Sequence, residues 1–375
     1  MTGPQAQATA SEPPAIKPQF DHAVLQSGEV FWRDHQRWLE QKGYMLRPRY
    51  HPSWVASWRG ADDSWWNYED STPAARPPVM DATRIDTGEI VVLKRISKSE
   101  YPTEAEIMQF FTAEPLGSHP RNHCVPLLDH FDVPGEKNYQ ILVTPLLRKY
   151  NDPRFKSVGE AVEFFRQIFV ALQFMHQLKV AHRDCTEFNV MMDPRPTFPD
   201  LYHPQNPRMN LNWNGAPQYY TRTARPTKYY LIDFGLSRKF DPEGDPPLEV
   251  PVLGGDMTVP EYQDSTSPCD PFPVDVYYIG NMINEDFLLT SKGVEFMIPL
   301  INDMIQDDPS KRPTMDEVVS RFDDIRRKLS WWKLRSRLIE TSEGNFERFV
   351  RSVRHAVRTT IHVIRSRPAI PTPND

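Results

Sequence analysis

Two short motifs, each directly behind an apolar run, constrain the fold of this chain more than any other feature. Residues 182–184 read His-Arg-Asp and are followed by Asn189, and residues 233–235 read Asp-Phe-Gly. The runs before them, residues 178–181 and 229–232, have the apolar composition of short buried strands. Either motif alone would carry little weight. Their order, with each behind a strand-like run, argues against an accidental match.

The two motifs resemble the protein-kinase family, whose catalytic loop reads H-R-D-x-x-x-x-N and whose metal-binding turn reads D-F-G. The resemblance covers roughly residues 79–329. It implies an α+β, two-lobed protein-kinase-like fold, with a small antiparallel β-rich N-lobe and a larger, mainly helical C-lobe. It also implies ATP and Mg²⁺ as cofactors and an unidentified protein as substrate.

The resemblance implies a site of four polar side chains, Arg183, Asp184, Asn189 and Asp233. Asp184, preceded by Arg183, would orient the incoming hydroxyl or accept its proton. Asn189 and Asp233 would bind Mg²⁺ on the phosphates, because this ion prefers oxygen ligands and keeps part of its water shell. These residues form the predicted catalytic and metal-binding set.

A lysine earlier in the chain completes that set. Lys94 closes the run 91–94, Val-Val-Leu-Lys, which resembles the strand motif V-A-I-K of the family. The resemblance implies that its ammonium contacts the α- and β-phosphates and is oriented by a carboxylate from a helix. Glu104 is the predicted carboxylate, and Glu106 is the alternative.

The resemblance also predicts where the adenine lies. Aligning residues 142–147 with the hinge of the family makes Thr144 the gatekeeper, and backbone groups of Pro145 and Leu147 then meet the base. Val79, Val92 and Met191 would sandwich it. The alternative is that residues 142–147 are an ordinary buried strand without a role in binding.

Three later residues match structural positions of the family. Glu261 in Val-Pro-Glu resembles the glutamate of A-P-E, and Arg312 precedes a proline, so the resemblance implies a buried ion pair between them. Asp275 matches the helix aspartate that braces the catalytic loop. We expect these three residues to support the site without touching substrate.

The segment 238–257 contains no Ser, Thr or Tyr, and its acidic residues include Glu249. In members of the family, the arginine before the catalytic aspartate often pairs with a phosphorylated residue in the corresponding segment. We therefore hypothesise that Arg183 meets a fixed carboxylate here. A solvated acidic loop is the alternative.

The chain departs from the family at two points. Between residues 44 and 94 the only glycines are Gly60 and Gly88, so the Gly-rich loop that covers the phosphates is missing. Residues 77–78 are both proline, which has no N–H to offer. Thr186 stands where serine/threonine kinases carry a lysine.

The predicted function is a protein kinase acting on a protein hydroxyl, with serine or threonine as acceptor. The alternative is a catalytically weak or inactive pseudokinase that acts as a binding or scaffold module.

Apolar periodicity and turn residues predict the remaining elements. Strands are expected at 79–82, 89–96 and 141–147, and helices at 29–41, 102–112, 158–177, 274–289 and 296–306. Residues 195–226, rich in Pro, Asn, Tyr and Arg, have no periodicity and are expected to be a surface excursion between two short strands.

Five parts are expected along the chain. They are a disordered N-terminus (1–18), an aromatic and Pro-rich extension with an atypical start of the N-lobe (19–78), the N-lobe (79–147), the C-lobe with the insertion (148–329), and a basic tail (330–375). Residues 326–367 hold 12 Lys and Arg against 3 Asp and Glu, although the whole chain carries a net charge of −6. The tail is expected to form a helix that docks on the acidic body or binds an anionic partner.

Composition bears on the compartment. The N-terminus has no apolar run of a signal peptide, and no stretch of about eighteen apolar residues predicts a membrane span. The three cysteines are widely separated, which fits a reducing compartment. We therefore expect an intracellular protein, cytoplasmic or nuclear, without a transmembrane segment.

Overall fold

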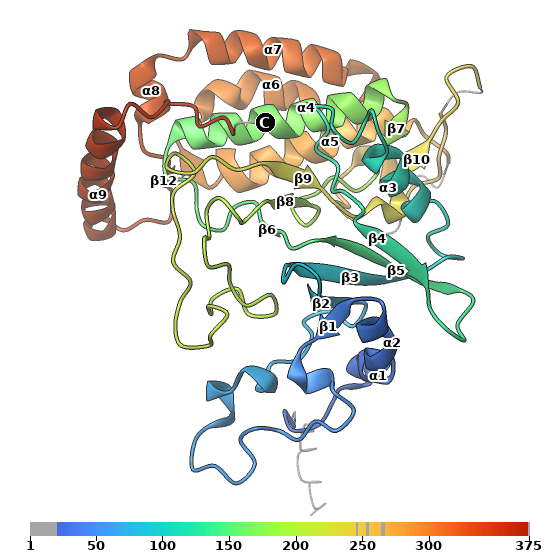
Figure 1. Ribbon diagram of the computed structural model, residues 1–375. Helices are drawn as coiled ribbons and strands as arrows, with labels where there is room; N and C mark the ends of the chain where they lie inside the picture. The colour runs from blue at the N-terminus through green and yellow to red at the C-terminus, as the bar shows by residue number, and fades with distance from the viewer. Residues whose placement is uncertain (1–20, 245–246, 253–254, 264–266, 374–375) are drawn as a thin grey trace, which may run out of the picture.

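The computed structural model describes residues 21–244, 247–252, 255–263 and 267–373. The predicted disordered segment 1–18 therefore lies outside the described residues. Mixed helix and antiparallel sheet make up the described chain, which is compatible with the expected α+β class (Figure 1).

A five-stranded antiparallel sheet lies in the first half of the chain, in the order β1-β2-β3-β5-β4. Its strands are β1 (Tyr44–Leu46), β2 (Val79–Arg84), β3 (Ile90–Ser97), β4 (Asp129–Asp132) and β5 (Tyr139–Pro145). The central strand β3 places Lys94 opposite Val79 on one side and Leu142 on the other. The predicted strands at 79–82, 89–96 and 141–147 are confirmed to within two residues.

Helices α1 (Ser27–Asp34) and α2 (Gln36–Gln41) lie against this sheet (Figure 1). Trp32 and Leu39 are fully buried in a hydrophobic cluster with sheet residues such as Met80. The prediction of one helix over 29–41 is wrong, because the backbone of His35 leaves the helical region at φ −101°, ψ 2°. The His35 ring also hydrogen-bonds the Phe31 carbonyl oxygen at 2.8 Å, which holds the break.

Most of the remaining helices gather on the other side of the sheet (Figure 1). They are α3 (Glu104–Thr112), α4 (Val158–Gln177), α5 (Pro271–Ile283), α6 (Ile298–Met304) and α7 (Met315–Lys328). Helix α4 has its predicted bounds, begins at the N-cap Ser157 and is buried along most of its length. The predicted helix 274–289 is α5 followed by a π-helical turn over Asn284–Leu288.

Strands of two or three residues pair with one another in the loops that follow the five-stranded sheet. They are β6 (Arg148–Lys149), β7 (Val180–Ala181), β8 (Val190–Met192), β9 (Tyr229–Leu231), β10 (Arg238–Lys239), β11 (Ser291–Lys292) and β12 (Ile339–Glu340). Strands β8 and β9 pair with each other, and β7 pairs with β10. These pairs place the two motifs of the sequence at neighbouring strand ends.

Two long excursions leave the regular elements and meet each other. Residues 47–78 connect β1 to β2, and residues 195–226 form the predicted excursion between β8 and β9, although Phe198 and Tyr202 within it are buried and do not lie on the surface. His203 lies 2.7 Å from Glu69, and the Trp213 indole donates a 3.2 Å hydrogen bond to the Trp66 carbonyl oxygen. The two excursions therefore lie side by side at one edge of the sheet (Figure 1).

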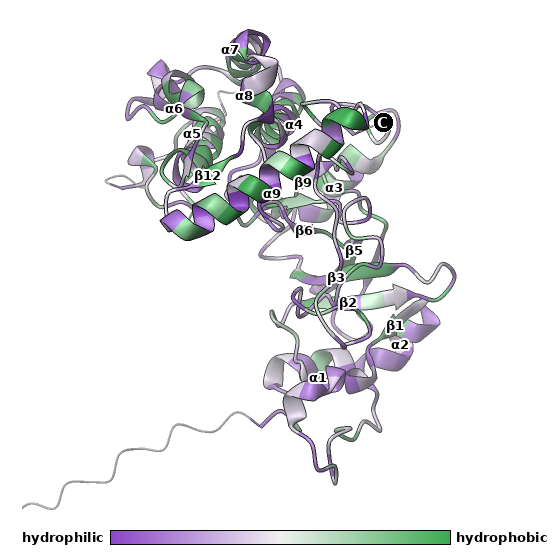
Figure 2. Cartoon of the chain, turned by 90° about the vertical axis from the view of Figure 1, so that its left-hand side faces the viewer, coloured by the Kyte–Doolittle hydropathy of each residue, from purple (hydrophilic) through white to green (hydrophobic). Residues whose placement is uncertain are grey.

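The tail holds α8 (Trp331–Arg335) and α9 (Asn345–Ile364), so the predicted helix is confirmed. The polar stripe of α9, with His355 and His362, faces the rest of the chain: the His355 ring hydrogen-bonds the Arg335 carbonyl oxygen at 2.9 Å. Hydrophobic and hydrophilic residues alternate along α9 (Figure 2). Its apolar stripe is exposed, including Phe346, Phe349, Val353, Val357, Ile361 and Ile364. Docking on the acidic body or binding an anionic partner stays a prediction.

Among the described helices, none has the length and apolar character that crossing a bilayer requires.

Candidate active site

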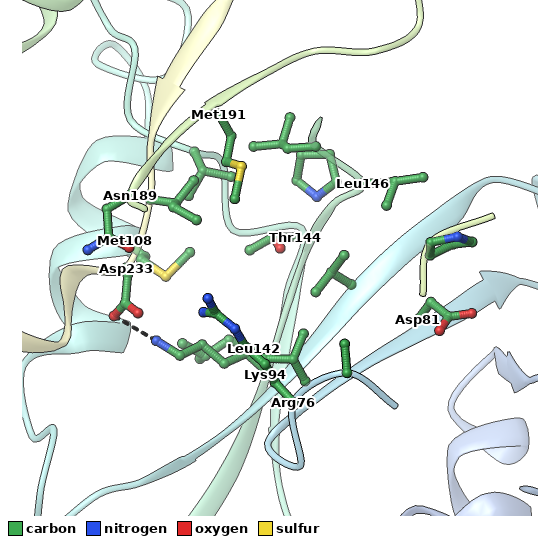
Figure 3. A pocket seen from close by; sticks show the side chains of 18 of the residues that line it. Arg76, Asp81, Lys94, Met108, Leu142, Thr144, Leu146, Asn189, Met191 and Asp233 are labelled. Carbon is green, nitrogen blue, oxygen red and sulfur yellow. Dashed lines mark hydrogen bonds and ion pairs between the residues drawn. The ribbon is translucent and has the colours of Figure 1, made fainter. Parts of the chain in front are cut away.

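Lys94 lies at the centre of a three-residue ion-pair cluster. Its Nζ is 2.6 Å from Oε1 of Glu104 on α3 and 2.8 Å from Oδ1 of Asp233, which follows β9. Figure 3 shows the contact with Asp233 inside a cavity. Glu106, the alternative carboxylate, is exposed. The structure therefore brings together the predicted Lys94, Glu104 and Asp233, which are up to 139 positions apart.

The cluster keeps the ammonium and the Asp233 carboxylate charged. Burial alone would lower the pKa of Lys94, but the facing carboxylates of Glu104 and Asp233 raise it above its usual value. Burial would raise the pKa of Asp233, yet the Lys94 ammonium holds it below its usual value. One fixed cation and one fixed anion thus face the cavity.

An unusual backbone conformation and a buried neighbour, Phe234, orient the Asp233 carboxylate. Its φ of 64° lies in the left-handed region, which a non-glycine residue adopts only at a cost. Phe234 is fully buried, with its ring centroid 6.2 Å from Phe111 of α3 and 5.4 Å from His182. This packing anchors the turn, and Figure 3 shows the Asp233 carboxylate in the cavity.

The loop after β7 is held by a buried aspartate on α5. Asp275 accepts hydrogen bonds of 2.7 Å from the backbone N–H groups of His182 and Arg183, and its side chain is fully buried. Asn189 donates to Oδ2 of Asp184 at 2.7 Å and to its carbonyl oxygen at 2.9 Å. Asp275 therefore sits where the resemblance implied, and the loop around Asp184 is fixed from two sides.

Asp184 keeps one oxygen unused. Its Oδ1 is buried without a hydrogen-bond partner among the described residues. Burial, with a further contribution from the Asp233 carboxylate, raises the pKa of Asp184 to about 6, although the hydrogen bond from Asn189 opposes this. A carboxylate with a raised pKa and a free oxygen suits proton transfer near neutral pH.

This pKa predicts a pH profile for any reaction in which Asp184 accepts a proton. Only the ionised carboxylate can accept it, so kcat/KM should fall as the pH drops through about 6, by roughly tenfold per pH unit below that point. The profile should be measured between pH 5 and 8, with circular dichroism to show that the protein stays folded. A flat profile down to pH 5 would contradict this role.

Arg183 meets a carboxylate, as hypothesised. Its guanidinium lies 3.1 Å from Oε2 of Glu249 and also donates to the carbonyl oxygens of Leu236 and Val250 at 3.1 and 2.7 Å. The side chain of Arg183 is 3% exposed, so the pair is shielded on the arginine side. Glu249 thus links the loop of Asp184 to the segment that follows β10.

A cavity of about 350 Å³ opens beside Lys94 (Figure 3). Asn189 and Asp233 line it, and every residue predicted for the adenine site does so too: Val79, Val92, Thr144, Pro145, Leu147 and Met191. Thr144 on β5 pairs with Val92 on β3. The structure therefore gathers the predicted binding residues around one space.

The same cavity has lining residues that sequence reasoning missed. Ala75 and Arg76 come from the first excursion, and Pro204 and Gln205 come from the second. The Tyr202 hydroxyl, also from the second excursion, donates a 2.9 Å hydrogen bond to the carbonyl oxygen of Leu147, between β5 and β6. Neither excursion has periodicity or a family motif, so no signal in the sequence pointed to them.

The implied ion pair below the site is present. Arg312 donates to both carboxylate oxygens of Glu261 at 2.8 and 2.7 Å, and its side chain is fully buried. It also donates to the carbonyl oxygens of Gln306 and Pro273. The pair ties the segment before α5 to the start of α7.

Comparisons with known proteins agree with a kinase-like chain. No protein-family model matches it. It is 26% identical over 211 residues to a probable myosin light chain kinase of Dictyostelium discoideum. The matched segment covers 54% of this chain and 44% of that protein. It is also 26% identical over 128 residues to the serine/threonine-protein kinase prpf4B of the same organism, 31% of this chain and 15% of that protein. The chain spans less than half the length of either relative, and the similarity supports a kinase-like relationship.

Proposed function

We propose that this protein is an ATP- and Mg²⁺-dependent protein kinase that transfers the γ-phosphate to a serine or threonine hydroxyl. The observation that carries the proposal is the convergence of Lys94, Asn189 and Asp233 on one cavity, with Asp184 hydrogen-bonded to Asn189 beside it. In the proposed two-lobed arrangement, residues 79–147 belong to the smaller lobe and residues 148–329 to the larger.

The side chains present fit Mg²⁺ and the phosphates of ATP. Asp233 offers a carboxylate and Asn189 an amide oxygen, and both line the cavity. Such hard oxygen ligands, completed by phosphate oxygens and water, suit this ion. When bound, Mg²⁺ neutralises charge on the β- and γ-phosphates.

The residues of the chain then have distinct tasks in the transfer. Lys94, held by Glu104, presents a fixed ammonium to the α- and β-phosphates. Asp184 orients the acceptor hydroxyl and receives its proton on Oδ1 as the hydroxyl oxygen bonds to the γ-phosphorus and ADP leaves. Val92 and Met191 exclude water from the adenine.

A specific contact favours the alternative, a pseudokinase that acts as a binding module. Gly255 lies so near Asp184 that a Cβ atom on it would be 2.5 Å from Oδ1. An acceptor hydroxyl would have to enter beside this glycine. Thr186, in the place of the usual lysine, is buried and adds no positive charge.

Phosphate transfer from labelled ATP to pooled peptides with Ser, Thr or Tyr acceptors tests the proposal. Identification of the labelled amino acid as phosphoserine or phosphothreonine is the expected result. Labelled phosphotyrosine would contradict the acceptor class. ATP binding without any transfer would favour the binding module.

A further inference from the structure

The cavity contains a second positively charged side chain besides Lys94. Arg76 lies at the end of the excursion 47–78, which occupies the connection between β1 and β2. Figure 3 shows its side chain extending into the cavity that Lys94, Asn189 and Asp233 also line. The residue is exposed, so its guanidinium is accessible from the cavity.

Arg76 differs from Lys94 in its electrostatic partners. The Lys94 ammonium already lies within 2.8 Å of two carboxylates. Among the described residues, no carboxylate oxygen lies within 4.0 Å of a nitrogen of the Arg76 side chain. Its charge is therefore uncompensated and available to an anionic group that enters the cavity.

The backbone on both sides of Arg76 is anchored. The Ala75 N–H donates to Oε1 of Gln205 at 2.8 Å, and the amide nitrogen of Gln205 donates to Oδ1 of Asp81 at 2.7 Å. On the other side, the Trp32 indole donates to the Pro77 carbonyl oxygen at 2.9 Å. Through Gln205, the excursion 195–226 holds the end of the excursion 47–78 in place.

The turn that follows is stiff as well. The Val79 N–H donates to the Arg76 carbonyl oxygen at 3.0 Å and closes a turn over two prolines, whose rings restrict φ. Less backbone freedom is then lost when Arg76 meets a ligand, so the turn is preorganised for binding.

We propose that Arg76 binds the phosphate groups of the nucleotide, in the place of the backbone amides of a Gly-rich loop. This assignment rests on the proposed function. A guanidinium can donate two parallel hydrogen bonds to one phosphate, and it remains charged at every working pH. The prolines beside it have no N–H, so the side chain supplies the donors that this backbone lacks. The ligand class is a nucleoside di- or triphosphate.

The test is calorimetric titration of the full chain with Mg²⁺-ATP, Mg²⁺-ADP and adenosine. Arg76→Ala should weaken the binding of ATP and ADP roughly 10- to 100-fold, as expected for lost hydrogen bonds to a charged group. Binding of adenosine, which has no phosphate, should be unchanged. Arg76→Lys should recover only part of the loss, because an ammonium cannot bind a phosphate through two parallel donors.

Arg84→Ala is the matched control. Arg84 lies at the far end of β2 and pairs with Asp86 in an exposed turn, so its loss removes one surface cation outside the cavity. The assignment is overturned if Arg76→Ala binds ATP as tightly as the wild type, or if it loses adenosine and ATP equally. A wild-type protein that binds neither ligand contradicts the proposed function itself, and the assignment with it.

Discussion

Asp184→Asn should lower the rate of phosphate transfer by roughly 10²- to 10⁴-fold, the range expected for loss of a general base. The amide has almost the shape of the carboxylate but cannot accept the proton of the acceptor hydroxyl. Burial raises the pKa of Asp184 to about 6, so above that pH its charge opposes folding. The variant should therefore unfold at no lower temperature than the wild type.

Transfer should be measured under single-turnover conditions, with ATP affinity measured on the same samples. Glu106→Gln is the control, because Glu106 is an exposed carboxylate on α3 that lies outside the cavity lining. It should retain wild-type transfer. A rate for Asp184→Asn within a few fold of the wild type would remove Asp184 from the mechanism.

Arg312→Ala should reduce the free energy of unfolding by about 3–5 kcal/mol, the usual result of removing one partner from a buried ion pair. The substitution leaves the Glu261 carboxylate, only 10% exposed, without its two charged hydrogen bonds. It also removes the donor to the carbonyl oxygens of Gln306 and Pro273. Urea unfolding followed by tryptophan fluorescence measures the change.

Arg327→Ala on α7 provides the comparison. Arg327 pairs with Asp324 at 3.2 Å, but both side chains are more than half exposed, so its loss should cost less than about 1 kcal/mol. Equal unfolding free energies for Arg312→Ala and Arg327→Ala would show that the buried pair contributes no special stability.

Local patterns were enough to predict the elements that carry the chemistry. The strand around Lys94, helix α4 and the two motifs have strong apolar periodicity or fixed spacing, so their types and approximate bounds follow from short stretches of sequence. Pairing Lys94 with Glu104 needed the family resemblance, because the two residues come from separate elements. The break at His35 had no comparable signal, since helical spacing continues across it.

The lining residues that come from the two excursions could not be predicted, for a different reason. Gln205 and Ala75 are 130 positions apart, and both lie in excursions without periodicity. Their contact depends on how two irregular chains fold over the sheet edge, which no local propensity determines. The absence of glycines was evident from the sequence, whereas the arginine that enters the cavity was not.

The orientation of α9 shows the same limit. Helical spacing of Phe349, Val353 and Val357 predicted the helix, and an apolar stripe normally faces a core. Instead the stripe is exposed, and the buried residue of α9 is His362 on the polar side, 3.4 Å from the Thr221 hydroxyl. Periodicity specifies that a face is apolar but not what covers it.

Calorimetric titration of the full chain with ATP, in Mg²⁺ and in EDTA, tests the proposed nucleotide and Mg²⁺ site when wild type and Asp233→Ala are compared. Mg²⁺ should tighten ATP binding to the wild type by roughly tenfold or more, because Asp233 and Asn189 would ligate the ion on the phosphates. Asp233→Ala should lose this dependence on Mg²⁺. Wild-type protein that binds no ATP, or that binds it equally well in EDTA, would contradict the proposed ATP- and Mg²⁺-dependent function.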